Sequence, residues 1–398
     1  MSLSIKDTTI LRGLGQRLAE IAALPIQKEK AELWRRLNRL ERVRPMVCLY
    51  NLTWEETKGL ITLETEDPFA RDIEWDLRKK LFHWDNMKDD TVYEPVVYSQ
   101  IIDTRKWMFE ENHYGFVVED NLEPDIPPAP IAIDWEGGER NYQQMCEIFN
   151  GILRVEKRGE NGYGTGILDH WVVWRGMDKC FTDLIDNPDW VHRWLNAMVE
   201  WHLHQLGEYE RLGYLNLNNG ANAIDPGGLG FTDELPQPDF DGTHVRAKDM
   251  WGMTAAQIFA VVSPSLHEEF AIPHDSRILQ QFGLACYGCC EPLDKKIDII
   301  KKGIPNLRRV SISPWADVAR SSEGLGKDFV FSCKPNPALL GMEGWDISIA
   351  EKYLRDALSK TRENVVEVIM KDLHTVRNEP QRMTDWVNMA MRLAEEYA

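Results

Sequence analysis

The sequence predicts an α/β protein, a single (β/α)8 barrel preceded by an N-terminal helical extension. Segments with strand-like and helix-like patterns alternate from about residue 180 onward, as βαβ units around a parallel sheet require. The chain has 398 residues, 43% of them hydrophobic, which suffices for one large barrel core. We therefore assign residues 1–43 to the extension and residues 44–398 to the barrel.

The first third of the chain predicts two helical stretches and one buried strand. Apolar residues at helical spacing predict helix over residues 10–43, which Pro25 is expected to divide. The run Met-Val-Cys-Leu-Tyr at 46–50 predicts the first strand, and residues 67–90 predict a charged helix. The proline-rich acidic segment 119–136 is expected to form an ordered loop.

The second half of the chain predicts a regular alternation. A helix is expected from Asn187-Pro188 to Gly213, because asparagine caps a helix and proline suits its first turn. Further strands are predicted at 214–218, 282–287, 307–312, 329–332 and 365–370. Further helices are predicted at 264–272, 293–302, 317–324, 349–361 and 382–396.

The composition argues against several classes of protein. There are 64 acidic and 46 basic residues, a net charge of −18, and no basic stripe, so a nucleic-acid partner is not expected. No apolar run is long enough to cross a membrane, and the N-terminus lacks signal-peptide features. Seven cysteines do not resemble a secreted disulfide framework. We expect a cytoplasmic protein without membrane partners, and the oligomeric state stays open.

Catalytic groups of such barrels follow the carboxyl ends of the strands, so polar residues at those positions are candidates. His374 follows the last predicted strand and is the best-placed general acid or base, although a loop histidine also serves to bind backbone. Asn218 and Asn219 would orient a substrate oxygen or close a turn. The other substrate-binding candidates chosen in this way are Tyr50, Glu291, Ser313 and Trp315.

A group of cysteines suggests a metal. Cys289 lies in the run Cys-Tyr-Gly-Cys-Cys-Glu at 286–291, and Cys333 follows a later strand. Thiolates and a carboxylate that converge at one end of a barrel would bind zinc. The alternative is that these are reduced cysteines that pack as small apolar groups. The glycine-rich runs at 227–230 and 326–328 lack the pattern of a nucleotide-binding loop.

Residues 254–340 carry a resemblance to a known family. They contain a helix that starts at Ser-Pro, a second helix after a proline, a strand that ends in Cys-Tyr-Gly-Cys, and the stretch Ser-Cys-Lys-Pro-Asn-Pro-Ala-Leu-Leu-Gly at 332–341. This pattern resembles the uroporphyrinogen decarboxylase superfamily, which are (β/α)8 barrels. The decarboxylases of that family carry an N-terminal arginine pair that grips a tetrapyrrole. Residues 44–54 lack this pair, so decarboxylation is not expected.

The resemblance therefore implies the other branch, the corrinoid-dependent methyltransferases. Members that act on thiols hold zinc with His-x-Cys and a distant Cys. Here Tyr287 stands at the His position, Cys289 at the first Cys, and Cys333 is the candidate for the last. A tyrosine there fits a substrate that is not a thiol, which implies the methyltransferase component of an anaerobic O-demethylase for methoxyarenes. The alternatives are a zinc-dependent methylcobalamin:thiol methyltransferase and a non-catalytic binding protein.

The implied reaction sets the roles of the candidate residues. The Co(I) corrinoid of a partner protein attacks the methyl carbon of a small-molecule methyl donor, an aryl methyl ether. The phenolate that leaves needs a proton or a Lewis acid, which Tyr287, His374 or zinc would supply. The corrinoid is expected on a separate protein, because the run Asp372-Leu-His-Thr-Val-Arg377 has arginine where the corrinoid-binding motif requires glycine.

Overall fold

The computed structural model describes residues 3–51, 53–104, 117–128 and 131–398. Its strands are β1 (Met46–Asn51), β2 (Val96–Gln100), β3 (Ile102–Asp103), β4 (Ile133–Asp134), β5 (Arg154–Arg158), β6 (Gly164–Thr165), β7 (Trp251–Thr254), β8 (Leu284–Tyr287), β9 (Leu307–Ile312), β10 (Val330–Cys333) and β11 (Val365–Leu373).

The α-helices of the described residues are α1 (Ile5–Ala22), α2 (Pro25–Asn38), α3 (Trp54–Thr57), α4 (Pro68–Asn86), α5 (Trp135–Phe149), α6 (Ile167–Arg175), α7 (Met177–Asp186), α8 (Pro188–Arg211), α9 (Pro264–Phe270), α10 (Ile272–Leu279), α11 (Ile297–Gly303), α12 (Val318–Leu325), α13 (Ala338–Gly341), α14 (Ile347–Lys360) and α15 (Gln381–Glu396). Short 3-10 turns lie at Lys58–Leu60, Ala247–Asp249 and Gln257–Val261. Within the described ranges, no helix combines the length and the apolar composition needed to cross a bilayer.

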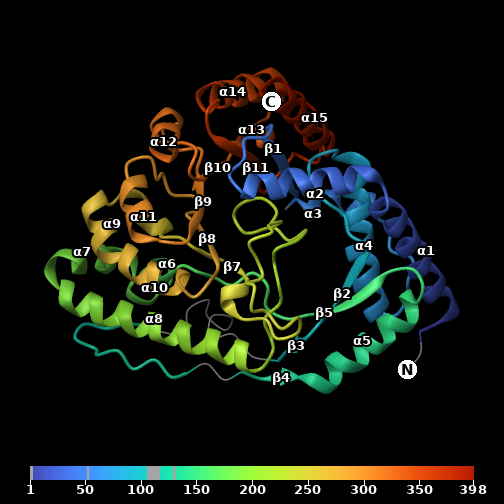
Figure 1. Cartoon of the computed structure of the whole chain (residues 1–398), viewed down its shortest axis with the longest axis horizontal. Helices are drawn as coiled ribbons and strands as arrows, with labels where there is room; N and C mark the ends of the chain where they lie inside the picture. The colour runs from blue at the N-terminus through green and yellow to red at the C-terminus, as the bar shows by residue number, and fades with distance from the viewer. Residues whose placement is uncertain (1–2, 52, 105–116, 129–130) are drawn as a thin grey trace.

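A curled parallel sheet of seven strands forms the centre of the fold. Its order is β1-β11-β10-β9-β8-β7-β6, and each neighbouring pair is parallel. Figure 1 shows the helices arranged around this sheet in a ring. In the part of the chain that the structure describes, the sheet ends at β1 and β6, while β2 and β5 pair separately. The predicted α/β alternation is therefore confirmed, whereas closure into an eight-stranded barrel is not.

The predicted strand at 214–218 is wrong. Only one bridge forms there, between Leu215 and Glu160. The reason is the Asn218 side chain, whose amide donates to the Trp251 carbonyl and accepts from the Trp251 N–H, both at 2.9 Å. A side-chain amide therefore occupies the two backbone groups of β7 that a neighbouring strand would have bound.

The segment 218–235 lies on the concave side of the sheet, in the middle of the ring in Figure 1. Side chains from the surrounding elements hold its backbone. Asn38 of α2 donates to two of its carbonyls (3.0 and 2.8 Å), and Tyr50 donates to a third (2.8 Å). Glu367 of β11 accepts one of its N–H groups (3.0 Å). The segment thus fills the space that a closed barrel would give to inward-pointing side chains.

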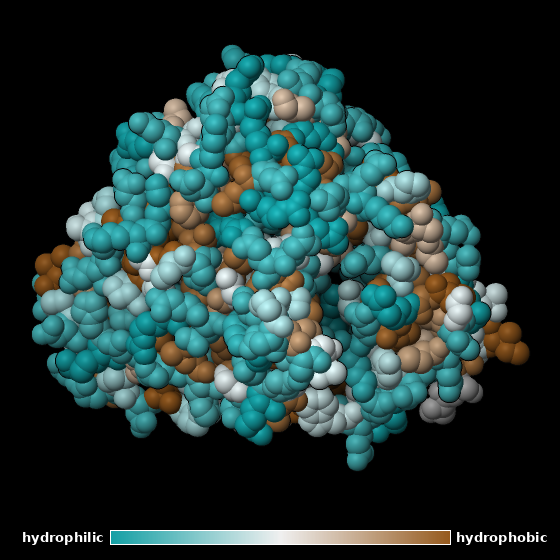
Figure 2. Space-filling model, in the orientation of Figure 1, coloured by the Kyte–Doolittle hydropathy of each residue, from teal (hydrophilic) through white to brown (hydrophobic). Residues whose placement is uncertain are grey.

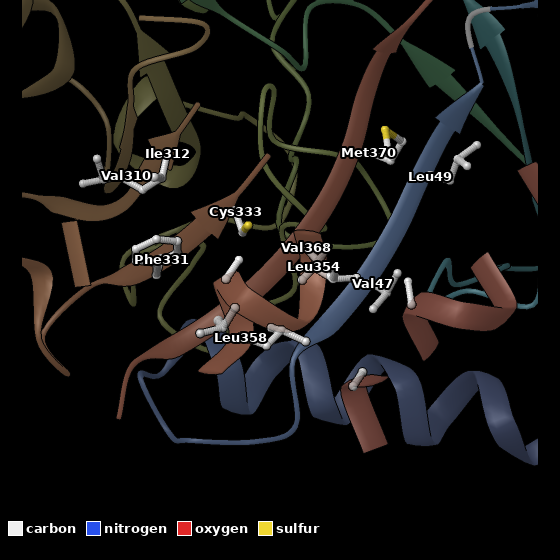
Figure 3. Packing of buried hydrophobic residues seen from close by; sticks show 14 of the residues in the cluster. Val47, Leu49, Val310, Ile312, Phe331, Cys333, Leu354, Leu358, Val368 and Met370 are labelled. Atoms are coloured by element: carbon white, nitrogen blue, oxygen red, sulfur yellow. The ribbon is translucent and has the colours of Figure 1, made fainter. Parts of the chain in front are cut away.

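The convex side of the sheet carries the largest apolar core. Alternate residues of β1, β9, β10 and β11 point to this side and share one apolar cluster with residues of α14 and α15. Figure 3 shows part of this cluster, with Val47, Leu49, Val310, Ile312, Phe331, Cys333, Val368 and Met370 of the strands and Leu354 and Leu358 of α14. Burial of this kind contributes about 25 cal/mol per Å² of apolar surface. The rigid convex core fixes the strand ends at which the polar residues described below lie.

The N-terminal part of the chain forms the two helices α1 and α2, as its helical pattern predicts. Pro25 begins α2, and two residues separate it from the end of α1, as expected from the effect of proline on the helical backbone. α1 packs against α4 and α5. The buried Trp34 of α2 donates from its indole to the Asp90 carbonyl at 2.9 Å. α2 therefore covers the concave face next to the central segment.

Candidate active site

An aromatic cavity of about 670 Å³ lies beside β1. Its walls come from the carboxyl ends of β1, β2 and β5, from α4, and from the central segment. Figure 2 shows a hollow at this place, between the central segment and α4. The aromatic side chains that line the cavity are Tyr50, Trp54, Phe69, Tyr93 and Tyr98. The cavity occupies the gap in which the sheet does not continue from β1.

Two cationic side chains enter this cavity around Tyr98. The guanidinium carbon of Arg158 lies 3.1 Å from the Tyr98 ring centroid, and the Lys80 ammonium lies 5.9 Å from it. Arg158 also donates to the Asn222 side-chain oxygen at 2.8 Å. Among the described residues, neither cation has a carboxylate oxygen within 4.0 Å. Burial lowers the pKa of both groups.

The neighbouring Lys79 provides a contrast within the same cavity. Its ammonium lies 2.8 Å from the Asp76 carboxylate. The charge of Lys79 is thus balanced by the protein, whereas Lys80 and Arg158 leave positive charge in the cavity. An anion, or an oxygen on which negative charge develops, is the ligand that this arrangement stabilises.

A second polar cluster lies at the ends of β8 and β11. The Lys371 ammonium is 3.2 Å from the Cys289 sulfur and 3.5 Å from the Cys290 sulfur. The two sulfurs are 3.5 Å apart, and Cys290 donates to the Asp372 carboxylate at 3.5 Å. The hydrogen bond from Cys289 and the charge of Lys371 lower the pKa of Cys290. One of the two thiols is therefore the more readily ionised.

The two predicted proton donors lie outside the aromatic cavity. Tyr287 is fully buried between the sheet and the helices, where its hydroxyl contacts His267 of α9 (2.8 Å) and Asp275 of α10 (3.0 Å). Burial raises the pKa of Tyr287 well above its ordinary value. His374 is exposed just after β11. Neither residue lines the cavity.

Three predicted substrate-binding residues hold backbone instead. Asn218 binds β7 as described above, and Asn219 donates to the Leu235 carbonyl. Glu291 is buried and accepts the N–H groups of Cys289 (2.9 Å) and Ala256 (3.2 Å). Polar residues that follow strands can thus stabilise the backbone instead of binding a substrate.

The remaining predicted residues divide between two places. Tyr50 lines the aromatic cavity, although its hydroxyl already donates to a carbonyl of the central segment. Ser313 is buried, and its hydroxyl has no hydrogen-bond partner among the described residues. Trp315 is 68% exposed and lines a different hollow, together with Val261. Of the substrate-binding candidates, the structure therefore brings only Tyr50 to the cavity.

The two predicted zinc ligands have different surroundings. Cys333 points to the convex side and belongs to the apolar core in Figure 3, where burial raises its pKa to about 11. Cys289 contacts Cys290 and Lys371, whose ammonium competes with a cation for the thiolates. In the described part of the chain, no three His, Cys, Asp or Glu side chains group in a way that would hold a metal. The donor set that the resemblance implies therefore does not fit zinc.

No motif in the sequence pointed to Lys80, Tyr98 or Arg158. Tyr98 and Arg158 belong to β2 and β5, which pair with each other outside the main sheet. The sequence does indicate a short strand at β2, because the run Val-Val-Tyr after Pro95 is typical of one. Nothing in the sequence indicated which strand β2 would pair with.

Comparisons with known proteins show a likeness to solved structures. No family model and no curated protein sequence matches the chain. Among solved structures, a methyltransferase from Methanosarcina mazei is similar to the chain, with 11% sequence identity and a TM-score of 0.49. The similarity covers 92% of this chain and 98% of that chain. The function is therefore argued below from the residues of the cavity.

Proposed function

We propose that the protein is an enzyme that transfers a methyl group. More specifically, we propose the methyltransferase component of an O-demethylase, which binds a methoxylated aromatic and passes its methyl group to the Co(I) corrinoid of a partner protein. The observation that carries the proposal is the aromatic cavity with two cations that have no carboxylate partner among the residues that the structure describes. We place this activity in the cytoplasm, as the composition predicts.

The shape and lining of the cavity suit an aryl methyl ether. A volume of about 670 Å³ lies within the range of small-molecule sites. Tyr50, Trp54 and Tyr98 offer ring faces and edges, against which an aromatic substrate packs with favourable offset or edge contacts. We assign the cavity to the methyl donor alone, and the corrin ring stays on the partner protein.

The cations match the charge that the reaction creates. When the methyl group departs, negative charge grows on the ether oxygen, which becomes a phenolate. Lys80 and Arg158 stabilise that oxygen more than they stabilise the neutral ether, and such differential stabilisation is what lowers a barrier. Since neither cation has a carboxylate partner within the described ranges, their charge is available for this purpose.

Lys80 also supplies the proton that the phenolate needs. Burial lowers its pKa, which brings the ammonium nearer to the range in which it releases a proton to a phenolate. Arg158 keeps its proton at any working pH and acts by charge and by position over Tyr98. In this proposal, the role that the sequence assigned to Tyr287 or His374 moves to Lys80.

The methyl acceptor is the second substrate. A Co(I) corrinoid is a strong nucleophile toward methyl carbon, and the cavity opens at the carboxyl ends of the strands, where a partner protein has access. The protein's own residues hold the donor in one orientation and exclude water from the leaving oxygen.

The test is a reconstituted reaction with a panel of methoxyarenes such as guaiacol and veratrole. With a reduced corrinoid protein present, we expect phenol release and formation of the methylated corrinoid in equal amounts. Without the corrinoid protein, no phenol should form. Turnover in the absence of corrinoid, or none across the panel with several corrinoid proteins, would falsify the proposal, and ligand binding without turnover would favour the non-catalytic alternative.

A further inference from the structure

Cys289 and Cys290 differ from the other cysteines of the chain. Cys48, Cys180, Cys286 and Cys333 are buried, and Cys146 is half-buried on α5. Cys289 and Cys290 are half-buried, adjacent in sequence, and have their sulfurs 3.5 Å apart. They also share one ammonium, that of Lys371.

We propose that Cys289 and Cys290 form a reversible dithiol–disulfide site that reacts with small-molecule disulfides. The geometry carries this inference: two sulfurs lie close together, a cation faces both of them, and a carboxylate accepts the hydrogen bond of Cys290. The inference does not depend on the proposed methyl transfer, because the cluster is separate from the residues that line the aromatic cavity.

The first step is attack on the external disulfide, RSSR. The Cys290 sulfur loses its proton toward Asp372 and water, and the Lys371 ammonium stabilises the thiolate. This thiolate forms a bond to one sulfur of RSSR, and the RS–SR bond breaks. The leaving thiolate takes up a proton and departs as RSH.

The second step closes the pair. Cys289 loses its proton to water, and its thiolate attacks the Cys290 sulfur of the mixed disulfide to form the Cys289–Cys290 bond. The bond between Cys290 and SR breaks, and the leaving RS⁻ takes up a proton and departs as the second RSH. The two cysteines together lose two electrons and two protons, and RSSR gains them. The sulfurs must approach by about 1.5 Å to reach bonding distance. Because adjacent Cα atoms lie only about 3.8 Å apart, closing this bond requires adjustment of the peptide unit between the two cysteines as well as side-chain rotation.

Lys371 and Asp372 have distinct roles in this site. The ammonium lies within 3.5 Å of both sulfurs, so it favours the thiolate form in either step. Asp372 lies 2.8 Å from the same ammonium, so the carboxylate both positions Lys371 and receives the Cys290 hydrogen bond. Lys371 and Asp372 are adjacent in sequence near the end of β11, and this strand holds them opposite the end of β8.

The experiment treats the full chain with oxidised glutathione and follows each cysteine by peptide mass spectrometry. For the wild type, we expect the peptide with residues 289 and 290 to lose two hydrogens and to keep no glutathione. In Cys289→Ser, glutathione should stay attached to Cys290, because the closing thiol is absent. Cys146 is the internal reference for a half-buried thiol and should react at least about tenfold more slowly.

Variants of Lys371 test whether its charge activates the two thiols or whether the thiols react only because they are exposed. Lys371→Met should slow the reaction at pH 7 about tenfold, and Lys371→Arg should restore most of the rate, because it keeps the positive charge. Phenylarsine oxide, which bridges two neighbouring thiols, should bind this pair in the wild type but not in Cys289→Ser or Cys290→Ser, and its binding involves no oxidation. A persistent glutathione adduct in the wild type, or a rate equal to that of Cys146 in both wild type and Lys371→Met, would overturn the proposal.

Discussion

At the scale of single residues, Lys79 and Lys80 are neighbours in sequence that differ in whether a carboxylate balances their charge. Both line the cavity, but Lys79 is paired with Asp76, and Lys80 has no carboxylate within ion-pair distance among the described residues. Burying a cation without a carboxylate partner costs stability, and we infer that an anionic ligand offsets this cost. The same reasoning applies to Arg158, which contacts Tyr98 and Asn222 but no carboxylate within that distance in the described part of the chain.

The first prediction follows from this contrast. Lys80→Met should lower phenol release about 10²-fold, because it removes the proton donor and one stabilising charge. The loss should shrink for substrates whose phenols are more acidic, since those leave without protonation. Lys79→Met is the matched control and should retain most of the activity. Equal losses for the two variants, or the same loss across the substrate series, would count against the role of Lys80.

The pH profile of turnover tests the same residue in another way. If the Lys80 ammonium is the acid, activity is present at low pH and is lost as the pH rises through its pKa. Because burial lowers this pKa, the loss should begin at a lower pH than an ordinary lysine would give. The test is to measure kcat as a function of pH for the wild type and for the Arg158→Lys variant. A profile that is flat up to the ordinary lysine range would exclude Lys80 as the acid.

Asp275 supports a prediction about stability. Burial raises its pKa to about 8, although hydrogen bonds from Thr254 and Tyr287 oppose the shift. In the unfolded chain its pKa is about 3.9. Folding therefore takes up a proton between these two values, so the stability from this group is full below about pH 4 and falls as the pH rises to about 8.

Asp275→Asn should remove this dependence, because an amide stays neutral and keeps hydrogen bonds to both hydroxyls. The free energy of unfolding of the variant, relative to wild type, should rise by up to about 1.4 kcal/mol per pH unit between about pH 5 and pH 7. Urea unfolding at several pH values measures it. Parallel curves for the two proteins would show that the Asp275 carboxyl ionises normally.

At the scale of secondary structure, the central segment 218–235 replaces part of a sheet. The Asn218 side chain forms hydrogen bonds with the backbone of β7. Side chains of α2, β1 and β11 hold the backbone of the segment from three sides. Its glycines permit this approach: a Cβ on Gly228 would lie 2.4 Å from the Trp34 ring and 2.6 Å from the Glu367 carboxylate. The segment is thus packed as tightly as an element of the core.

Gly228→Ala should therefore destabilise the protein by about 1–3 kcal/mol, which is typical of an overpacked site. Gly220→Ala is the matched control in the same segment, because its nearest neighbour would be a Glu94 oxygen at 3.7 Å, an ordinary contact. Thermal unfolding of both variants compares them. Similar melting temperatures for the two would mean that the segment yields easily and does not form part of the core.

The helices and the strands of this protein differ in how well sequence predicts them. Helix ends carry local signals, so Pro25, Pro188 and the capping residue Asp317 lie at or next to the starts of helices as expected. β9 was predicted over the residues that it occupies, since a run of buried apolar residues is typical of a parallel strand. The predicted strand at 214–218 failed because Asn218 binds β7 with its side chain, a long-range contact that no local pattern reveals.

At the scale of the whole molecule, the site was less predictable than the fold. The rule that candidates follow the strands selected Tyr50 correctly as a cavity residue but also selected residues that serve the backbone, such as Asn219 and Glu291. Alternation along β8 and β10 sends Tyr287 and Cys333 to the convex side, although their neighbours point inward. Which face a residue takes depends on the register of the strand, and the sequence alone does not fix that register.

The net charge of the chain supports a last prediction, which rests on the proposed partner. A charge of −18 gives the protein an acidic field, which attracts a partner with a basic docking face and repels an acidic one. The Debye length falls to about 10 Å at 0.1 M salt, so attraction of this kind weakens as salt is added. The value of kcat/KM for the corrinoid protein should therefore fall about tenfold between about 20 and 200 mM salt. The KM for a neutral methoxyarene should stay nearly constant, because its cavity contacts are not long-range electrostatic ones. Steady-state kinetics with each substrate varied in turn measures both quantities. The acidic field does not guide the partner to this site if kcat/KM for the corrinoid protein and KM for the methoxyarene respond alike to salt. The same conclusion follows if kcat/KM for the corrinoid protein rises with salt.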